Sequence, residues 1–256
     1  MKDESEKSIE QMVGGRMICF SGAHRTGKTT LCQELAKHGY EFVPANMSQV
    51  CKDMGINTDE DLSFDARREM QESMLLRMSS LFEAKNDEDF LGQMVLCDRG
   101  PIDLMVYTAT KLHEQGLLAD EGSEIVQWSL DYFKRCVEMS KRLVGGIVLV
   151  QPGIPVVADA KSASVETQSK IAQGMRNTFD FYVGTGEMAS MGWVVPEDLT
   201  DLEERVEVTR QTLSIFQDLR WRETCKVMHP NVEFFSDAVK AEDGTLLEAP
   251  SDGLIH

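Results

Sequence analysis

Residues Gly22 to Thr29 have the form G-x-x-x-x-G-K-T, and this octapeptide constrains the chain more than any other feature. Gly22 and Gly27 let the backbone turn tightly and aim successive N–H groups at phosphate oxygens. Lys28 is placed to reach β- and γ-phosphates, and the Thr29 hydroxyl to ligate Mg²⁺. We therefore expect ATP and Mg²⁺ to bind here. The residues expected to contact the nucleotide are Gly22, Ala23, His24, Arg25, Thr26, Gly27, Lys28, Thr29 and Thr30.

The residues around this octapeptide match the context that a phosphate-binding loop requires. The run 16–20 is mostly apolar, as expected of a buried parallel strand. After the loop, Leu31 and Leu35 share one helical face, and Gly39 is placed to end the helix. The alternative is a chance match without a nucleotide, and the correct strand and helix on either side argue against it.

A second informative stretch is 93–98, an apolar run that ends in Asp98. Such a run is typical of a Walker B strand, which delivers a carboxylate at the edge of the sheet beside the phosphate loop. Arg99 follows directly, and Pro101 suits the first turn of the next helix. The alternative is that Asp98 simply ends a strand at a turn; the phosphate loop favours a function.

Hydrophobic periodicity orders the rest of the chain. Short apolar runs at 40–44, 147–150 and 193–196 predict strands, and Gly145-Gly146 is expected to stop the helix before 147. Periodic stretches predict helices from 64 to 84, from 101, from Ser123 to 143, from about 165 and from 202. In the first of these, the methionine-rich face is expected in the core, and Arg67, Arg68 and Arg77 in solvent unless one faces an acceptor phosphate. The alternation predicts an α/β fold of the P-loop NTPase type, a parallel sheet flanked by helices.

We expect a flexible lead at 1–14, one domain at 15–228 and a tail at 229–256. Between the fourth and fifth strands, residues 157–191 suggest a helical lid that brings cations over the transferring phosphate and excludes water. Its cations are Lys161, Lys170 and Arg176. The alternative for each of them is a solvated helix surface.

Composition narrows the classes of partner. The net charge is −17, which argues against a broad nucleic-acid or anionic-membrane surface. The six cysteines include no C-x-x-C pair, and Cys19 and Cys97 lie in predicted core strands, so neither a disulfide framework nor a zinc site is expected. Without a membrane-length apolar run or a secretory signal, the expected location is cytoplasmic, or the host cytoplasm if a phage encodes the chain.

The stretches 21–30 and 96–103, followed by a tyrosine-bearing helix, resemble the P-loop nucleoside and nucleotide kinases. The similarity points to the AAA-type predicted kinase/ATPase group, which includes nicotinamide-riboside kinase-like domains and many bacteriophage kinases. The segments 151–155 and 196–205 also look like the phage members. The resemblance spans roughly residues 15 to 220.

This resemblance implies roles for individual residues. Lys28 would be catalytic, Thr29 would hold Mg²⁺, and Arg99 and Arg176 would act on phosphate. Asp98 would serve as catalytic base on an acceptor hydroxyl or as a metal ligand. Many relatives place an acid just after the second strand to grip the acceptor, whereas residues 43–48 here read V-P-A-N-M-S.

The leading hypothesis is a kinase that moves the ATP γ-phosphate to a nucleoside or a (deoxy)nucleoside monophosphate. The alternative is DNA modification, in which a phage-type kinase phosphorylates 5-hydroxymethyluracil within DNA. A non-kinase ATPase switch is the third hypothesis. The expected partners are a nucleotide or nucleoside acceptor or modified DNA, without a membrane; a homodimer stays open.

Overall fold

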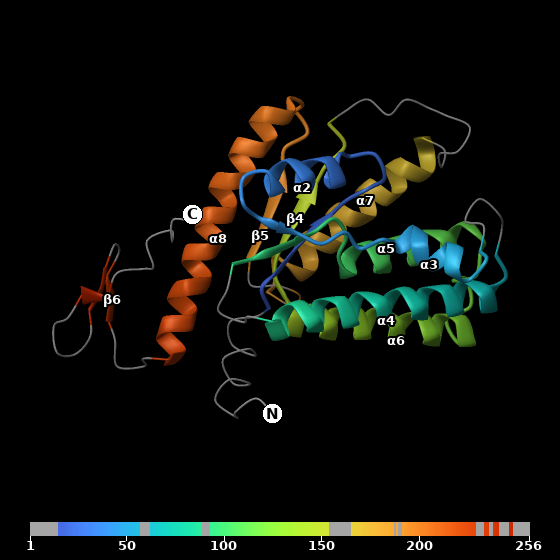
Figure 1. Cartoon of the computed structure of the whole chain (residues 1–256). Helices are drawn as coiled ribbons and strands as arrows, with labels where there is room; N and C mark the ends of the chain where they lie inside the picture. Colours follow the sequence, from blue (N-terminus) through green and yellow to red (C-terminus); the bar gives the residue numbers. More distant parts are fainter. Residues whose placement is uncertain are drawn as a thin grey trace.

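Five parallel strands form the central sheet of the computed structural model (Figure 1). They are β1 (Met17–Ser21), β2 (Glu41–Phe42), β3 (Val95–Cys97), β4 (Val144–Val150) and β5 (Met191–Val195), in the order β2-β3-β1-β4-β5. The structure describes residues 15–56, 62–88, 93–153, 165–186, 188, 191–228, 233–235, 238–240 and 246–247. The lead predicted at 1–14 lies outside these residues. The α/β fold predicted from the alternation is confirmed.

One face of the sheet is covered by a thick helical layer. Its members are α3 (Met47–Asp53), α4 (Phe64–Glu88), α5 (Pro101–Glu114), α6 (Glu124–Leu143) and α7 (Val165–Tyr182). Alternate strand residues point into this layer, among them Cys19 and Cys97, both fully buried. The methionines of α4 join them: Met70, Met74 and Met78 are buried, as their four-residue spacing predicts.

The other face packs against α2 (Lys28–Ala36) and α8 (Leu202–Met228), which Figure 1 shows together on one side of the sheet. The strand residues of opposite parity, such as Ile18 and Phe20, contact Leu31, Leu35 and Phe216 here. Each such side chain, fully buried, stabilises the fold by about 1.5–3 kcal/mol. Both faces of the three central strands, β1, β3 and β4, are therefore buried, which is why these strands are largely continuous apolar runs.

The predicted helix stop at Gly145-Gly146 is wrong. The helix α6 ends at Leu143 and β4 begins at Val144, so the two glycines belong to the strand. Close packing explains them: a Cβ on Gly145 would lie 2.2 Å from the Gly15 carbonyl oxygen, and one on Gly146 would lie 3.0 Å from the Phe216 ring. The other end of α6 agrees with the sequence, since Ser123 Oγ accepts from the Val126 N–H at 3.3 Å.

The helix expected near Val165 begins there, but it is more than a surface lid. In α7, Ile171, Met175 and Phe179 are buried in the core, and the helix packs against α5 as the crossover between β4 and β5. Residues 157–164, 187, 189 and 190 of the predicted lid lie outside the described residues, and Lys161 with them. The prediction that Arg67 is solvated is wrong, because its side chain on α4 is buried, whereas Arg68 pairs with Glu124 at 3.1 Å near the surface.

The described residues beyond α8 form a small antiparallel sheet of β6 (Glu233–Phe235), β7 (Ala238–Lys240) and β8 (Leu246–Leu247). The rest of the predicted tail, from 229, lies outside the described residues. In the part of the chain that the structure describes, no helix combines the length and the apolar character needed to cross a membrane.

Candidate functional site

The sheet order brings the two sequence motifs together. Strand β1 lies beside β3, with Cys19 opposite Cys97, so the segments that follow both strands emerge at the same edge. Segment 22–27 follows β1 closely and Asp98 follows β3 directly. Ligand sites of parallel sheets lie at this carboxyl edge.

A cavity of about 370 Å³ opens at this edge. It is lined by loop and α2 residues, by Asp98 and Arg99, and by the start of α3 at Asn46, Met47 and Ser48. The predicted nucleotide contacts that line it are His24, Arg25, Gly27, Lys28, Thr29 and Thr30. The other three, Gly22, Ala23 and Thr26, belong to the same loop but are buried and do not line the cavity.

The loop has the backbone geometry that its glycines predict. Gly22 has φ +152° and Gly27 has φ +86°, values that L side chains rarely adopt. A Cβ on Gly22 would also lie 2.3 Å from the Val150 carbonyl oxygen. Both the backbone φ and the lack of space therefore require glycine at this position. Helix α2 begins at once, with the Leu31 N–H bonded to the Gly27 carbonyl at 2.9 Å. Its N-terminus adds a positive dipole to the cavity.

Lys28 is buried and bends back over its own loop. Its Nζ donates to the carbonyl oxygens of Gly22 and Ala23, at 2.7 and 2.6 Å. Desolvation lowers the pKa of Lys28 to about 8, an effect that the Arg99 charge reinforces and the carboxylates of Asp103 and Asp98 oppose. An anion in the cavity would relieve this cost by supplying the charge that burial removed.

Asp98 ties three segments together. Its Oδ2 accepts from the Thr29 hydroxyl at 2.6 Å, and its Oδ1 accepts from the Ala45 N–H at 3.0 Å. The carboxylate therefore connects β3 to α2 and to the segment after β2. Residues 43–48, which follow β2, contain no acid. This segment contacts Asp98 through the backbone N–H of Ala45 and not through a side chain.

Arg99 lies in a cluster of polar and aromatic side chains. Its Nη2 is 3.4 Å from His24 Nδ1, its Nη1 is 3.9 Å from Asp103 Oδ1, and its guanidinium lies 5.5 Å from the centre of the Tyr107 ring. His24 and Tyr107 also contact each other, with ring centroids 4.7 Å apart. Stacking and charge together fix Arg99 at the wall of the cavity.

The pKa values of His24 and Asp103 in this cluster are both shifted. Desolvation, followed by the charges of Arg99, Lys28 and Arg25, lowers the pKa of His24 to about 3, although the residue as a whole is exposed. The ring is therefore neutral at physiological pH. Burial raises the pKa of Asp103, with Lys28 and Arg99 acting in the opposite direction. Asp103 also caps α5, since its Oδ2 accepts from the Gly100 N–H at 2.9 Å.

Asp103 and Tyr107 were not predicted as site residues. The spacing from Gly100 to Asp103, an acid at the third helical position, is a sequence signal for the cap that could have identified the first. Tyr107 lies one turn further along the same helix face. No comparable pattern marks its contact with His24.

Arg176 is not brought to this cavity. Its Nε pairs with Asp180 Oδ2 at 2.8 Å on its own helix, and it is not among the residues that line the cavity. Lys170 likewise pairs with Glu166, at 2.7 Å. A role for Arg176 over the transferring phosphate stays a prediction.

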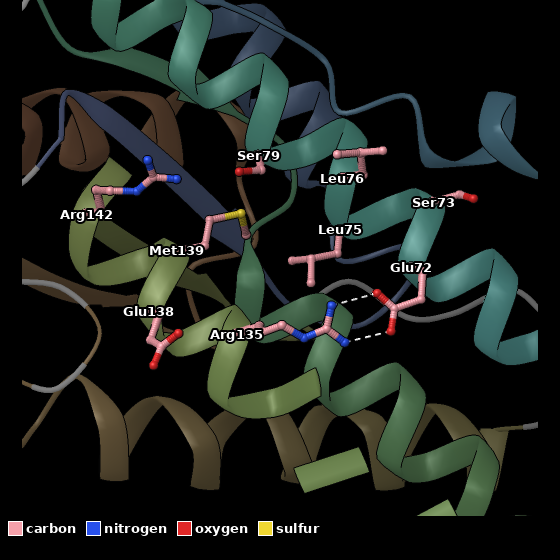
Figure 2. A pocket seen from close by; sticks show the side chains of 9 residues that line it. All are labelled: Glu72, Ser73, Leu75, Leu76, Ser79, Arg135, Glu138, Met139 and Arg142. Atoms are coloured by element: carbon pink, nitrogen blue, oxygen red, sulfur yellow. Dashed lines mark hydrogen bonds and ion pairs between the residues drawn. The ribbon is translucent and has the colours of Figure 1, made fainter. Parts of the chain in front are cut away.

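A larger cavity, of about 650 Å³, lies between α4 and α6 (Figure 2). Figure 2 shows Arg135 and Glu72 pointing toward each other, joined by two hydrogen bonds of 2.7 and 2.6 Å. Trp128 Nε1 also donates to Glu72, at 2.8 Å. The charges at this end of the groove are satisfied within the protein, and the network stabilises helix packing.

Comparisons with known proteins bear on the fold of the chain. A family model described as an AAA domain matches residues 17–133. The fold resembles a thymidylate kinase from Candida albicans, at 16% identity and a TM-score of 0.54, over 82% of this chain and 93% of that one. A shikimate kinase from Acinetobacter baumannii, solved in complex with shikimate, matches at 13% identity and a TM-score of 0.39, over 82% and 98%. None of the curated proteins compared with the chain matches it.

The match to the thymidylate kinase shows that the chain has an α/β fold of the P-loop kinase type. A G-x-x-x-x-G-K-T loop in such a fold is typical of ATP binding, usually with Mg²⁺.

Proposed function

We propose that the protein is an ATP-dependent phosphotransferase that moves the γ-phosphate to a nucleoside or a (deoxy)nucleoside monophosphate. The observation that carries this proposal is the convergence of Lys28, Thr29, Asp98 and Arg99 on one cavity at the carboxyl edge of the sheet. Bare hydrolysis needs only the loop and the metal. A second cation and a carboxylate beside the loop, Arg99 and Asp98, favour an acceptor.

Thr29 and Asp98 fit a Mg²⁺ site. Both offer hard oxygen atoms, and the hydrogen bond of 2.6 Å between them places these oxygens together at the start of α2. The described residues contain no group of three or more His, Cys, Asp or Glu side chains that could hold a metal alone. That agrees with a Mg²⁺ held by one or two protein oxygens together with the phosphates of a nucleotide. When bound, Mg²⁺ would neutralise phosphate charge.

The chain's own residues would act mainly by positioning and charge. The loop N–H groups would bind the phosphates, and Lys28 would exchange its bonds to the Gly22 and Ala23 carbonyls for β- and γ-phosphate oxygens. Arg99, held by Tyr107, would stabilise charge on the transferring group. With a hydroxyl acceptor, Asp98 would accept the proton late; with a phosphate acceptor, it would orient Thr29 and the metal.

The acceptor would enter over the start of α3. Asn46, Met47 and Ser48 line this side of the cavity, and no acid stands among them. A short polar and apolar wall of this kind suits a neutral sugar or base edge, with Arg99 available for a phosphate group. The net charge of −17 disfavours a polymer substrate, whose binding depends on many phosphate contacts.

A transfer screen tests the proposal. The protein would be mixed with γ-labelled ATP and Mg²⁺ and offered nucleosides, nucleoside monophosphates, and normal or hydroxymethylated DNA. We expect ADP formation to depend on one small acceptor, which gains the label, and Lys28→Met to abolish the transfer. Label on hydroxymethylated DNA, with salt-sensitive DNA binding, would instead favour the DNA kinase. Turnover of equal rate without any acceptor would contradict both kinases.

A further inference from the structure

Arg205, in the first turns of α8, is one of the largest fully buried side chains of the described residues, at 2% exposure. Arginine is seldom buried without a paired acid. Here no carboxylate of the described residues forms an ion pair with it, and its partners are backbone carbonyls. Its Nη1 donates to the Thr26 carbonyl oxygen at 3.1 Å, and its Nε donates to that of Leu199.

The first of these bonds reaches into the phosphate loop. Thr26 is separated from Arg205 by 179 positions in the sequence, so the bond joins α8 to the loop directly. In a trans peptide the C=O and the following N–H point in opposite directions. A guanidinium that holds the Thr26 carbonyl on the protein side therefore turns the Gly27 N–H toward the other side. That N–H immediately precedes Lys28, at the position where α2 begins.

The surroundings of Arg205 are built around its guanidinium. Its Nη2 is buried without a hydrogen-bond partner among the described residues. Gly153, just after β4, leaves the room: a Cβ there would lie 2.7 Å from Nη2 and 2.1 Å from the Glu197 carbonyl oxygen. Three segments thus meet at one guanidinium, namely the phosphate loop, the end of β4 and the connection from β5 to α8.

We propose that Arg205 is a positioning residue that fixes the Thr26–Gly27 peptide for phosphate binding and links it to the β5–α8 connection at Leu199. The inference rests on the proposed function, because it needs a nucleotide in the loop. Its chemistry is specific to arginine. The planar fork donates to two carbonyls at once, whereas a lysine ammonium on a flexible stem lacks that fixed geometry. The buried positive charge also adds to the potential that attracts phosphate.

The test compares Arg205→Met and Arg205→Lys with Arg220→Lys. Arg220 is a second buried arginine of α8, roughly 22 Å further along the helix at 1.5 Å per residue, and serves as the matched control. The readouts are the Kd for ATP·Mg²⁺ without acceptor, and the rise in Tm that ATP·Mg²⁺ produces. We expect Arg205→Met to weaken ATP binding by about tenfold or more, Arg205→Lys to recover part of the loss, and Arg220→Lys to bind as the wild type does.

A merely structural role would give a different result. It would lower the Tm of the free protein while leaving the Kd and the ATP-induced rise unchanged, and that outcome for Arg205→Met would overturn the inference. If Arg205→Met does not fold, Arg205→Lys and Gly153→Ala, which disturb the same guanidinium, carry the comparison by the same readouts. A wild-type protein that fails to bind ATP·Mg²⁺ would instead contradict the proposed function itself.

Discussion

The Thr29 hydroxyl donates a 2.6 Å hydrogen bond to the Asp98 carboxylate across the carboxyl edge of the sheet. The same carboxylate accepts the Ala45 N–H at 3.0 Å, so one side chain fixes both Thr29 and the backbone segment that follows β2. Asp98 therefore stands between the expected nucleotide and the expected acceptor. Its removal should affect both transfer and metal dependence, while the core beneath it stays intact.

The first prediction concerns Asp98→Asn. The amide keeps the size of the side chain but loses the charge and the basic oxygen. With a hydroxyl acceptor, we expect kcat to fall by about 10²- to 10⁴-fold, as is usual when a general base is lost. With a phosphate acceptor, the main effect should be a higher Mg²⁺ requirement. Steady-state rates across a Mg²⁺ titration separate the two cases.

Asp180→Asn is the matched control, because among the described residues Asp180 forms its ion pair with Arg176, on the exposed side of α7. It should leave kcat and the Mg²⁺ requirement unchanged. Asp98→Asn with wild-type rates at every Mg²⁺ concentration would remove this residue from the mechanism.

The second prediction concerns the buried ammonium of Lys28. Its pKa is about 8 in the folded protein against 10.5 ordinarily, so between these values the unfolded chain binds more protons. Stability should therefore rise with pH across this window. The difference between a pKa of about 8 and one of 10.5 corresponds to about 3 kcal/mol of unfolding free energy. Urea unfolding at pH 7 to 10.5 gives the unfolding free energy of the wild type and of Lys28→Met at each pH. The wild-type slope minus the Lys28→Met slope should show this increase.

Two controls sharpen the Lys28 experiment. Lys37→Met removes an exposed ammonium paired with Glu34 and should keep the wild-type slope. Saturating ATP should flatten the slope of the wild type, since phosphate charge raises the Lys28 pKa again. A Lys28→Met protein whose slope matches the wild type would show that another group causes the pH dependence.

Much of the site could be predicted because its geometry is local. The loop, its strand and its helix are one continuous segment, and only glycine tolerates the backbone at Gly22 and Gly27. The adjacency of Asp98 followed from a general property of parallel sheets, whose carboxyl ends meet at one edge. This inference also requires β3 to be a direct neighbour of β1. The structure meets that requirement, because Cys19 of β1 is paired with Cys97 of β3.

The remainder depends on packing between distant segments, which periodicity does not encode. Arg205 lies on an amphipathic helix, where an arginine is expected in solvent, and only the fold brings it to Thr26. Gly145 and Gly146 were predicted to stop a helix. Nothing in the local sequence indicates that the backbone at Gly15 and the Phe216 ring of α8 pack so closely against β4. The helix α7 looked like a lid because its polar residues outnumber the few that reach the core.

The third prediction concerns Gly22→Ala. The substitution places a Cβ 2.3 Å from the Val150 carbonyl oxygen at a backbone φ of +152°. Backbone strain and the collision together should lower the free energy of unfolding by about 2–5 kcal/mol and impair ATP binding. Gly116→Ala is the control, since its φ is +70° but nothing lies within 4 Å of the added Cβ. It should cost about 1 kcal/mol, and equal losses in the two variants would refute the steric argument.

The last prediction concerns the Glu72–Arg135 pair between α4 and α6. The Arg135 hydrogen bond, with a smaller contribution from the Trp128 N–H, lowers the pKa of Glu72 against a desolvation effect in the opposite direction. Its stabilisation should be complete above the ordinary pKa of 4.5 and lost as pH falls below the folded value. A double-mutant cycle with Glu72→Gln and Arg135→Met should give a coupling energy of about 1 kcal/mol at pH 7, because both side chains are about a third exposed.

The more exposed Glu83–Arg142 ion pair is the control for this cycle and should give a coupling energy of less than about 0.5 kcal/mol. Equal coupling in the two cycles would show that the pair of hydrogen bonds between Arg135 and Glu72 adds nothing to helix packing.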